Sequence, residues 1–208
     1  MSRNPRTDVR AYPRSTRSSR GRRGVAGFTM LELLISLLIV LLGVLGLAGL
    51  IVRSNQAEME SYQRVQALML AQDMADRINA NRKVAACYSN GATGIQLGTA
   101  GGGYTGTPAC GAGTTPQEVR AVADMSAWNS LLTGSAEVLS GSNVGAMIGA
   151  RGCVNQIDTQ TYRVSVVWQG LAATAASSNT CANAAGLYGA TDNLRRVVTV
   201  TIRIATLS

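Results

Sequence analysis

The chain has 208 residues, with 19 basic and 11 acidic side chains, a formal net charge of +8 and no histidine. This length fits one modest domain with an appendage. A sequence without histidine excludes Ser-His-Asp and Cys-His catalysis, and it disfavours zinc because Cys-x-x-Cys is missing as well. The net charge raises the possibility of nucleic-acid binding, but eight arginines and a single acid, Asp8, lie within residues 1–27. The remainder is therefore nearly neutral.

Residues 1–27 are rich in Arg, Ser, Pro and Gly and show no apolar periodicity, so we expect no packed structure there. A basic segment beside an apolar run more often sets membrane topology than binds nucleic acid, although a nucleic-acid-binding arm is the alternative. We therefore predict a cytoplasmic N-terminus, with everything after Val52 across the membrane. The pattern differs from a secretory signal peptide, because the apolar run is too long and no small-residue cleavage site follows it.

Phe28 to Val52 is an apolar run with one ionisable residue, Glu32. It exceeds the about 20 residues that a helix needs to cross a bilayer. A carboxylate in such a segment costs about 2.5–3.5 kcal/mol on insertion scales, so Glu32 is a candidate functional residue. Glycines recur at three-residue spacing at 43, 46 and 49, which permits either close helix packing or local unwinding.

The segment from Arg23 to Glu32, with its basic leader, Gly27, Phe28 and the long apolar run, resembles the processing site of type IV prepilins and type II secretion pseudopilins. The resemblance implies that a membrane peptidase cleaves after Gly27 and methylates the new amino terminus on Phe28. It also implies that Glu32 pairs with the Phe28 amine of an adjacent subunit. The implied partners are major and minor pilin subunits, the prepilin peptidase and the inner-membrane assembly machinery.

The helix is expected to continue through residues 53–82, which lack proline and glycine. Glu60–Arg64 and Asp73–Arg77 are acid-first pairs at i,i+4 spacing. Apolar residues at three- and four-residue spacing predict one buried stripe, formed by Val65, Leu68, Ala71, Ala75 and Ile78. The second half should therefore pack beneath its own domain, whereas the first half needs lipid or other helices.

Residues 83–208 should form a globular head. The glycine-rich stretch 91–113 is expected to be a loop, because no Gly-Lys-Ser/Thr follows as in a phosphate-binding loop. Thr115, Pro116 and Glu118 predict a helix over about 116–132, with Thr115 as N-cap, proline at the first position and glutamate at the third. Trp128, at helical spacing, should anchor the core.

Alternating apolar residues predict strands at about 160–169 and 195–205, and residues 138–154 have room for one or two more. Residues 170–193 read as a long polar loop. One apolar face per strand favours an antiparallel sheet laid on a single helix. The fold class is therefore α+β, with a long N-terminal helix whose first half is transmembrane. This is also the type IV pilin fold that the resemblance implies.

Four cysteines lie beyond the apolar run: Cys87, Cys110, Cys153 and Cys181. An even count in an oxidising compartment suggests two disulfides tying the loops. We expect nearest-neighbour pairing, Cys87–Cys110 and Cys153–Cys181, among three connectivities. Free structural thiols are the alternative.

Residues 70–82, the helix around Trp128 and the strand 162–168 are similar to minor pilins of the PilV type. The resemblance implies a structural subunit of a type IV pilus, held in the inner membrane with a periplasmic head and then carried to the cell surface. We expect no enzyme activity, cofactor or metal. Three alternatives stay open: a type II secretion pseudopilin, a pilus-tip adhesin or DNA-uptake subunit, and a tethered domain outside any filament. Nucleic-acid binding is disfavoured, because Arg195-Arg196 is only a small basic pair.

Overall fold

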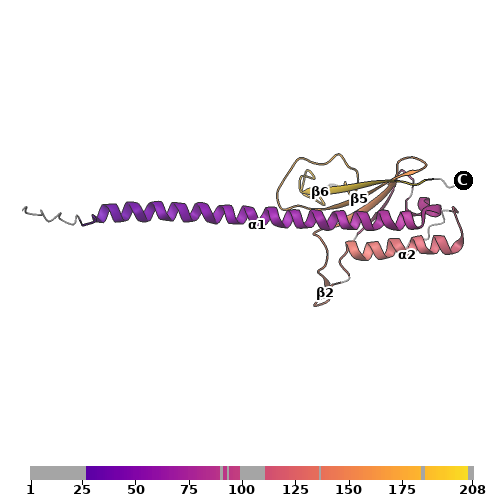
Figure 1. Ribbon diagram of the computed structural model, residues 1–208, viewed down its shortest axis with the longest axis horizontal. Helices are drawn as coiled ribbons and strands as arrows, with labels where there is room; N and C mark the ends of the chain where they lie inside the picture. The colour runs from indigo at the N-terminus through magenta and orange to yellow at the C-terminus, as the bar shows by residue number, and fades with distance from the viewer. Residues whose placement is uncertain are drawn as a thin grey trace, which may run out of the picture. The chain divides into compact units, whose positions relative to one another are not determined.

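The computed structural model describes residues 27–89, 91–92, 94–98, 111–135, 137–183 and 186–205. The predicted leader lies outside these ranges apart from Gly27. The chain divides into two compact units, one ending at Ala48 and the other beginning at Gly49. Each unit is described by itself below, with the element labels of Figure 1.

The first unit consists of the apolar part of helix α1, whose full extent is Met30–Ala80. Every described residue from Gly27 to Ala48 is exposed. Within the described ranges, α1 is the one helix long and apolar enough to cross a membrane. It continues unbroken through Gly43 and Gly46, and a Cβ built on either glycine would meet no atom within 4 Å. The structure therefore shows open space at these glycines and no unwinding.

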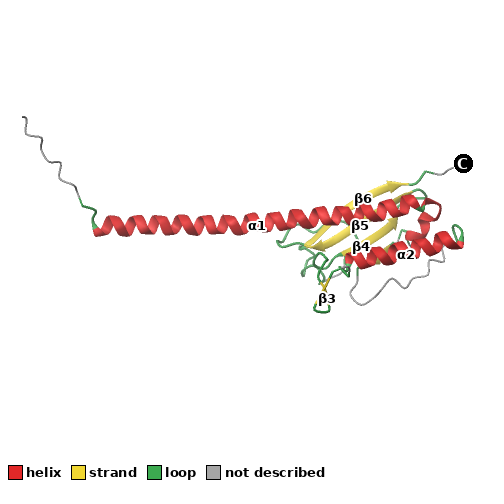
Figure 2. Cartoon of the chain, turned by 60° about the horizontal axis from the view of Figure 1, so that its bottom comes forward, coloured by secondary structure: helices red, strands yellow, loops and turns green. Residues whose placement is uncertain are grey.

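The second unit contains a four-stranded antiparallel sheet in the order β1-β4-β5-β6. The strands are β1 (Ile95–Leu97), β4 (Arg151–Gln156), β5 (Thr161–Gln169) and β6 (Arg195–Arg203). Helix α2 (Thr115–Leu132) runs beside the second half of α1, and both helices lie along the sheet (Figure 2). The predicted antiparallel sheet on the helix is confirmed. Strand β1 was missed, because its three residues sit in a glycine-rich stretch that reads as loop.

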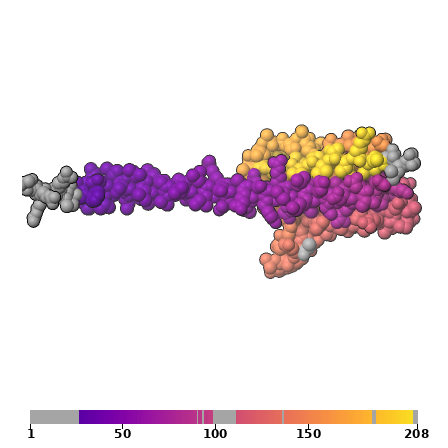
Figure 3. Space-filling view, in the orientation of Figure 1, coloured from indigo at the N-terminus to yellow at the C-terminus, as the bar shows by residue number. Residues whose placement is uncertain are grey.

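Two short elements complete the second unit. The 3-10 helix η1 (Arg82–Tyr88) follows α1 directly. Strands β2 (Val138–Leu139) and β3 (Ser142–Asn143) pair as a small hairpin, which stands out from the second unit in the space-filling view (Figure 3). Gln66 of α1 donates a hydrogen bond to the Gly145 carbonyl at 3.3 Å, which holds the segment after the hairpin against the helix.

The main core lies between the two helices and the sheet, and Trp128 is its largest fully buried side chain. Its indole Nε1 donates to the Leu70 carbonyl at 2.8 Å, so the ring is both enclosed and satisfied. Gly152 of β4 lies directly beneath it, and a Cβ there would collide with the indole ring and with Leu132. The predicted role of Trp128 as a core anchor is confirmed.

The buried face of α1 differs from the predicted stripe. Its buried residues are Gln63, Ala67, Ala71, Met74, Ala75 and Ile78, whereas Val65 and Leu68 are 49% and 48% exposed. Alanines at 67 and 71 present little side-chain bulk, so the helix can lie close to the structure it covers. The prediction chose the larger apolar residues Val65 and Leu68, which was wrong, whereas Ala71, Ala75 and Ile78 are buried as predicted.

The start of α2 also differs from prediction by one residue. Thr114 is the N-cap, and its backbone N–H donates to Gln117 Oε1 at 3.1 Å. The predicted assignment of Thr115 and Glu118 was wrong. Both Thr114 and Thr115 are good caps, and Gln117 can fill the third position of a capping box as well as a glutamate can.

A second, smaller cluster is formed by Cys153, Val167, Cys181, Ala182 and Tyr188. The disulfide Cys153–Cys181, with Cα atoms 5.7 Å apart, ties β4 to the loop after β5, as predicted. Cys87 is buried in η1. Its predicted partner, Cys110, lies outside the described residues, so that pairing stays a prediction.

Candidate processing and assembly site

The predicted cleavage position lies just before the first turn of α1. Gly27 and Phe28 are not helical, and Phe28 is 83% exposed. A Cβ built on Gly27 would meet no atom within 4 Å. The peptide bond between these two residues is therefore accessible and lies outside regular structure, the setting in which peptidases cut most readily.

Thr29 and Glu32 organise the helix start. Thr29 Oγ1 accepts the Glu32 N–H at 3.2 Å, and the Thr29 carbonyl accepts the Leu33 N–H at 3.2 Å. This is half of a capping box, and Glu32 also carries negative charge in the first turn, where the helix dipole favours it. Thr29 was missed in the sequence analysis, although the Thr-x-x-Glu spacing is the signal that identifies it.

The Glu32 carboxylate has no salt-bridge partner among the described residues. Its neighbours along the helix, Leu31, Leu33 and Ile35, are apolar and exposed. In lipid or in a bundle of helices, an unpaired carboxylate is strongly disfavoured. This position therefore favours a cationic group supplied from outside the chain.

Asp124, a buried acid of the head, serves structural contacts. Asp124 of α2 accepts Arg77 Nη1 at 3.1 Å and the Tyr88 hydroxyl at 2.6 Å. Asn81 donates to the same hydroxyl at 3.2 Å. Burial, followed by the hydrogen bond to Asp124, raises the pKa of Tyr88. These contacts join α1, η1 and α2, and no group of carboxylates or cysteines in the described ranges has the arrangement of a metal site.

Arg195, the first residue of β6, plays a comparable role for the loop between β5 and β6, and its side chain is fully buried. It pairs with Asp192 and donates to the carbonyls of Ser177, Asn179 and Cys181 at 2.7–2.9 Å. A buried guanidinium is stable only when its donors are satisfied in this way. Arg195 therefore fixes the loop, which argues against a basic nucleic-acid contact for Arg195-Arg196.

Two parts of the chain match models of known protein families. Residues 22–48 match a family model described as the prokaryotic N-terminal methylation motif. Residues 49–113 match a family model described as type IV pilin Tt1218. No curated protein and no solved structure matches the chain significantly.

The long apolar helix, the small antiparallel sheet packed on its second half and the Cys153–Cys181 disulfide make up the type IV pilin fold. The methylation motif and the pilin match adjoin each other along the chain. Together they support a pilin subunit of the type IV pilin family. This class of protein is structural and assembles with other pilin subunits after processing by the prepilin peptidase.

Proposed function

We propose that the chain is a minor pilin, a structural and assembly subunit of a type IV pilus. The observation that carries the proposal is Glu32, an unpaired carboxylate in the first turn of an exposed apolar helix. Cleavage after Gly27 would create a cationic amine at Phe28. That amine, on a neighbouring subunit, is the partner that Glu32 lacks.

The minor role rests on the similarity of residues 70–82, the Trp128 helix and the strand 162–168 to PilV-type minor pilins. The proposed location is the inner membrane, with the head in the periplasm, followed by incorporation into surface pili. The Cys153–Cys181 disulfide supports an oxidising compartment for the head.

Pilins are structural subunits, so we propose no enzyme activity.

Mass spectrometry of filaments sheared from the cell surface, beside the membrane fraction, tests this proposal. We expect a peptide that begins at N-methylated Phe28 in the sheared filaments. The mature peptide in membranes alone would favour a type II secretion pseudopilin, which shares the same N-terminal chemistry. A chain that still begins before Gly27 would contradict processing altogether.

Glu32→Ala tests the assembly step separately. The variant should be cleaved normally and yet be absent from filaments, because the incoming subunit loses its charge pairing. Glu58→Ala is the matched control, since Glu58 is an exposed acid on the same helix beyond the apolar run. Normal incorporation of Glu32→Ala would refute the assembly role.

Gly27→Ala tests the cleavage step. This variant should accumulate as the uncleaved form.

A further inference from the structure

A cavity of about 350 Å³ lies in the second unit beside η1, where β5 begins and β6 ends. This volume falls in the range of about 300–1,000 Å³ typical of small-molecule sites. Its walls combine charged, neutral polar and apolar groups, and Ile204 belongs to the apolar part. None of the described residues that line it is acidic.

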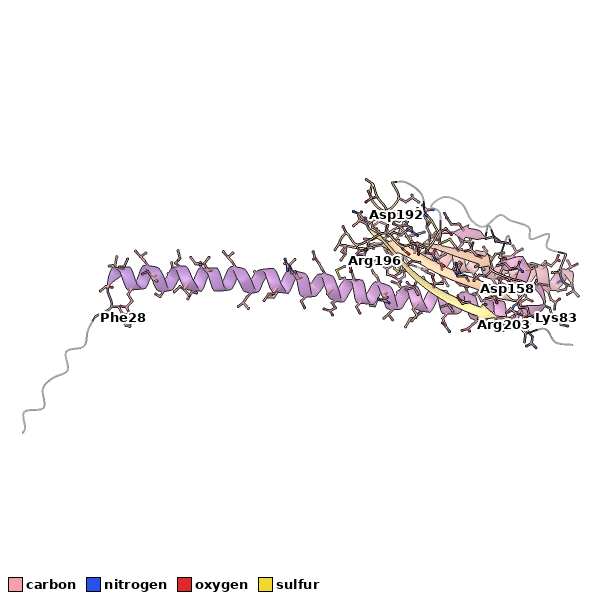
Figure 4. All side chains as sticks on the ribbon, turned by 90° about the horizontal axis from the view of Figure 1, so that it is seen from above. Phe28, Lys83, Asp158, Asp192, Arg196 and Arg203 are labelled. Atoms are coloured by element: carbon pink, nitrogen blue, oxygen red, sulfur yellow. A yellow bond between two sulfur atoms is a disulfide. The ribbon has the colours of Figure 1, made fainter. Side chains whose placement is uncertain are left out.

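The cavity carries positive charge that has no partner. Arg82 and Lys83 line it, both are exposed, and neither forms a salt bridge with a described residue. Lys83, Arg203 and Asp158 lie at the same end of the sheet (Figure 4). The Asp158 carboxylate is already occupied, because it accepts the backbone N–H groups of Gln160 and Thr161 at 2.8 and 2.7 Å. Positive charge therefore predominates at this end.

Neutral hydrogen-bonding groups face the same space. Tyr162 is 3% exposed and lines the cavity, yet its hydroxyl makes no hydrogen bond to a described residue. The hydroxyl is not among the buried polar atoms that lack a partner, so it is open to the cavity and free to donate to a ligand or to water. Burial, followed by the charge of Asp158, raises the pKa of Tyr162 above its ordinary value of 10.0, so the hydroxyl is protonated at neutral pH with or without the shift. The Gln156 side chain also lines the cavity, and no protein partner for its amide is seen in the described ranges.

A second cavity of about 400 Å³, lined by Glu60, Arg64 and Arg196, is a weaker candidate. Arg196 is already paired with Glu60 at 3.2 Å and also donates to Thr174 Oγ1 and the Ala172 carbonyl. Its charge is therefore neutralised and its donors are used, in contrast to the groups beside η1.

We propose that the cavity beside η1 binds a small organic anion of the sugar-acid class, such as a hexuronate. The carboxylate would meet Arg82 and Lys83, and the sugar hydroxyls would meet Tyr162 and Gln156. Guanidinium and ammonium groups are strong donors to carboxylates, whereas the neutral polar groups suit hydroxyls. The proposal goes beyond the role of a pilus subunit, because it concerns the head alone and is independent of Glu32.

Saturation-transfer NMR on the full mature chain in detergent micelles, with a micelle-only sample subtracted, tests the site with glucuronate, glucose and inorganic phosphate as probes. We expect saturable transfer to glucuronate and none to glucose. Arg82→Gln should weaken glucuronate binding about fivefold, as expected for the loss of one partly exposed charge pair. Tyr162→Phe, which removes only the hydroxyl, should also weaken it.

Arg64→Gln is the matched control, since Arg64 is an exposed arginine that lines the other cavity, and it should leave binding unchanged. Circular dichroism melting shows whether each variant folds, and Lys83→Gln replaces any that does not. The proposal is overturned if glucuronate does not bind, if glucose or phosphate competes equally well with it, or if Arg82→Gln and Lys83→Gln bind as the parent does. These outcomes leave the pilus assignment untouched, because shearing and mass spectrometry test that separately.

Discussion

Glu60 Oε1, on α1, lies 3.2 Å from Arg196 Nη2, on β6, and joins two residues 136 positions apart in the chain. The same carboxylate oxygen accepts the backbone N–H groups of Leu171 and Ala172 at 3.0 and 3.3 Å. One side chain therefore binds the helix to the last strand and to the start of the loop after β5. The expected pair Glu60–Arg64 is replaced by this tertiary contact, whereas Asp73–Arg77 forms as predicted, at 2.8 Å.

The first prediction concerns this contact. Glu60→Ala should lower the free energy of unfolding by about 1–3 kcal/mol, because it leaves the half-buried guanidinium of Arg196 without its carboxylate. The N–H groups of Leu171 and Ala172 lie at exposed residues and can donate to water instead. Chemical denaturation measures the change, and hydrogen exchange should quicken at Leu171 and Ala172. Glu58→Ala should change the free energy of unfolding by less than about 0.5 kcal/mol, as exposed substitutions usually do. Equal effects of the two variants would argue against the contact.

The second prediction concerns the close approach of Gly152 to Trp128. Gly152→Ala should destabilise the head by about 1–3 kcal/mol, because the new methyl group collides with the indole ring in a packed core. Denaturation of Gly152→Ala and Trp128→Leu, singly and together, measures the coupling. The double variant should cost less than the sum of the two singles, since the smaller side chain makes room for the methyl group. Strict additivity would mean that the two residues do not compete for space.

The third prediction concerns the Cys153–Cys181 disulfide, which ties β4 to the loop between β5 and β6. Cys153 and Cys181 are 28 residues apart, and closing a loop of that size stabilises a fold by about 3–4 kcal/mol in the chain-entropy model. The double variant Cys153→Ala, Cys181→Ala should lose about that much. It should also speed hydrogen exchange around Ser177 and Asn179, whose carbonyls hold Arg195. Unchanged exchange there would show that Arg195 fixes the loop unaided.

The fourth prediction concerns alkaline pH. The Tyr88 pKa is raised above its ordinary value of 10.0 by burial and by Asp124, so folding favours the protonated phenol. That stabilisation is complete below pH 10 and declines as the pH rises above it, because the unfolded chain ionises first. Tyr88→Phe should therefore flatten the fall in stability above pH 10. Denaturation curves across that range test this, with Tyr62→Phe, an exposed tyrosine, as control; equal slopes would contradict it.

The sequence was sufficient for features governed by local chemistry. An uninterrupted apolar run requires lipid or helical neighbours whatever the rest of the chain does, so the long helix and the exceptional Glu32 followed from composition and length. The methylation motif matched by residues 22–48 is likewise a linear pattern, whereas cleavage after Gly27 stays a prediction. Alternation in β5 and β6 predicted the two long strands, because a strand with one buried face must repeat every two residues.

Only the tertiary structure decided which groups meet across the chain. Glu60 pairs with Arg196 of β6, far away in the chain. Arg195 is buried because carbonyls of the loop between β5 and β6 surround it. Neither contact leaves a periodic signal in the sequence. The buried face of α1 includes the small residues Ala67 and Ala71 in place of the predicted Val65 and Leu68. Close packing depends on how well side chains fit as well as on their hydrophobicity. Periodicity therefore determined the elements of this protein, whereas long-range packing and charge pairing, which no local window contains, determined its contacts and its cavities.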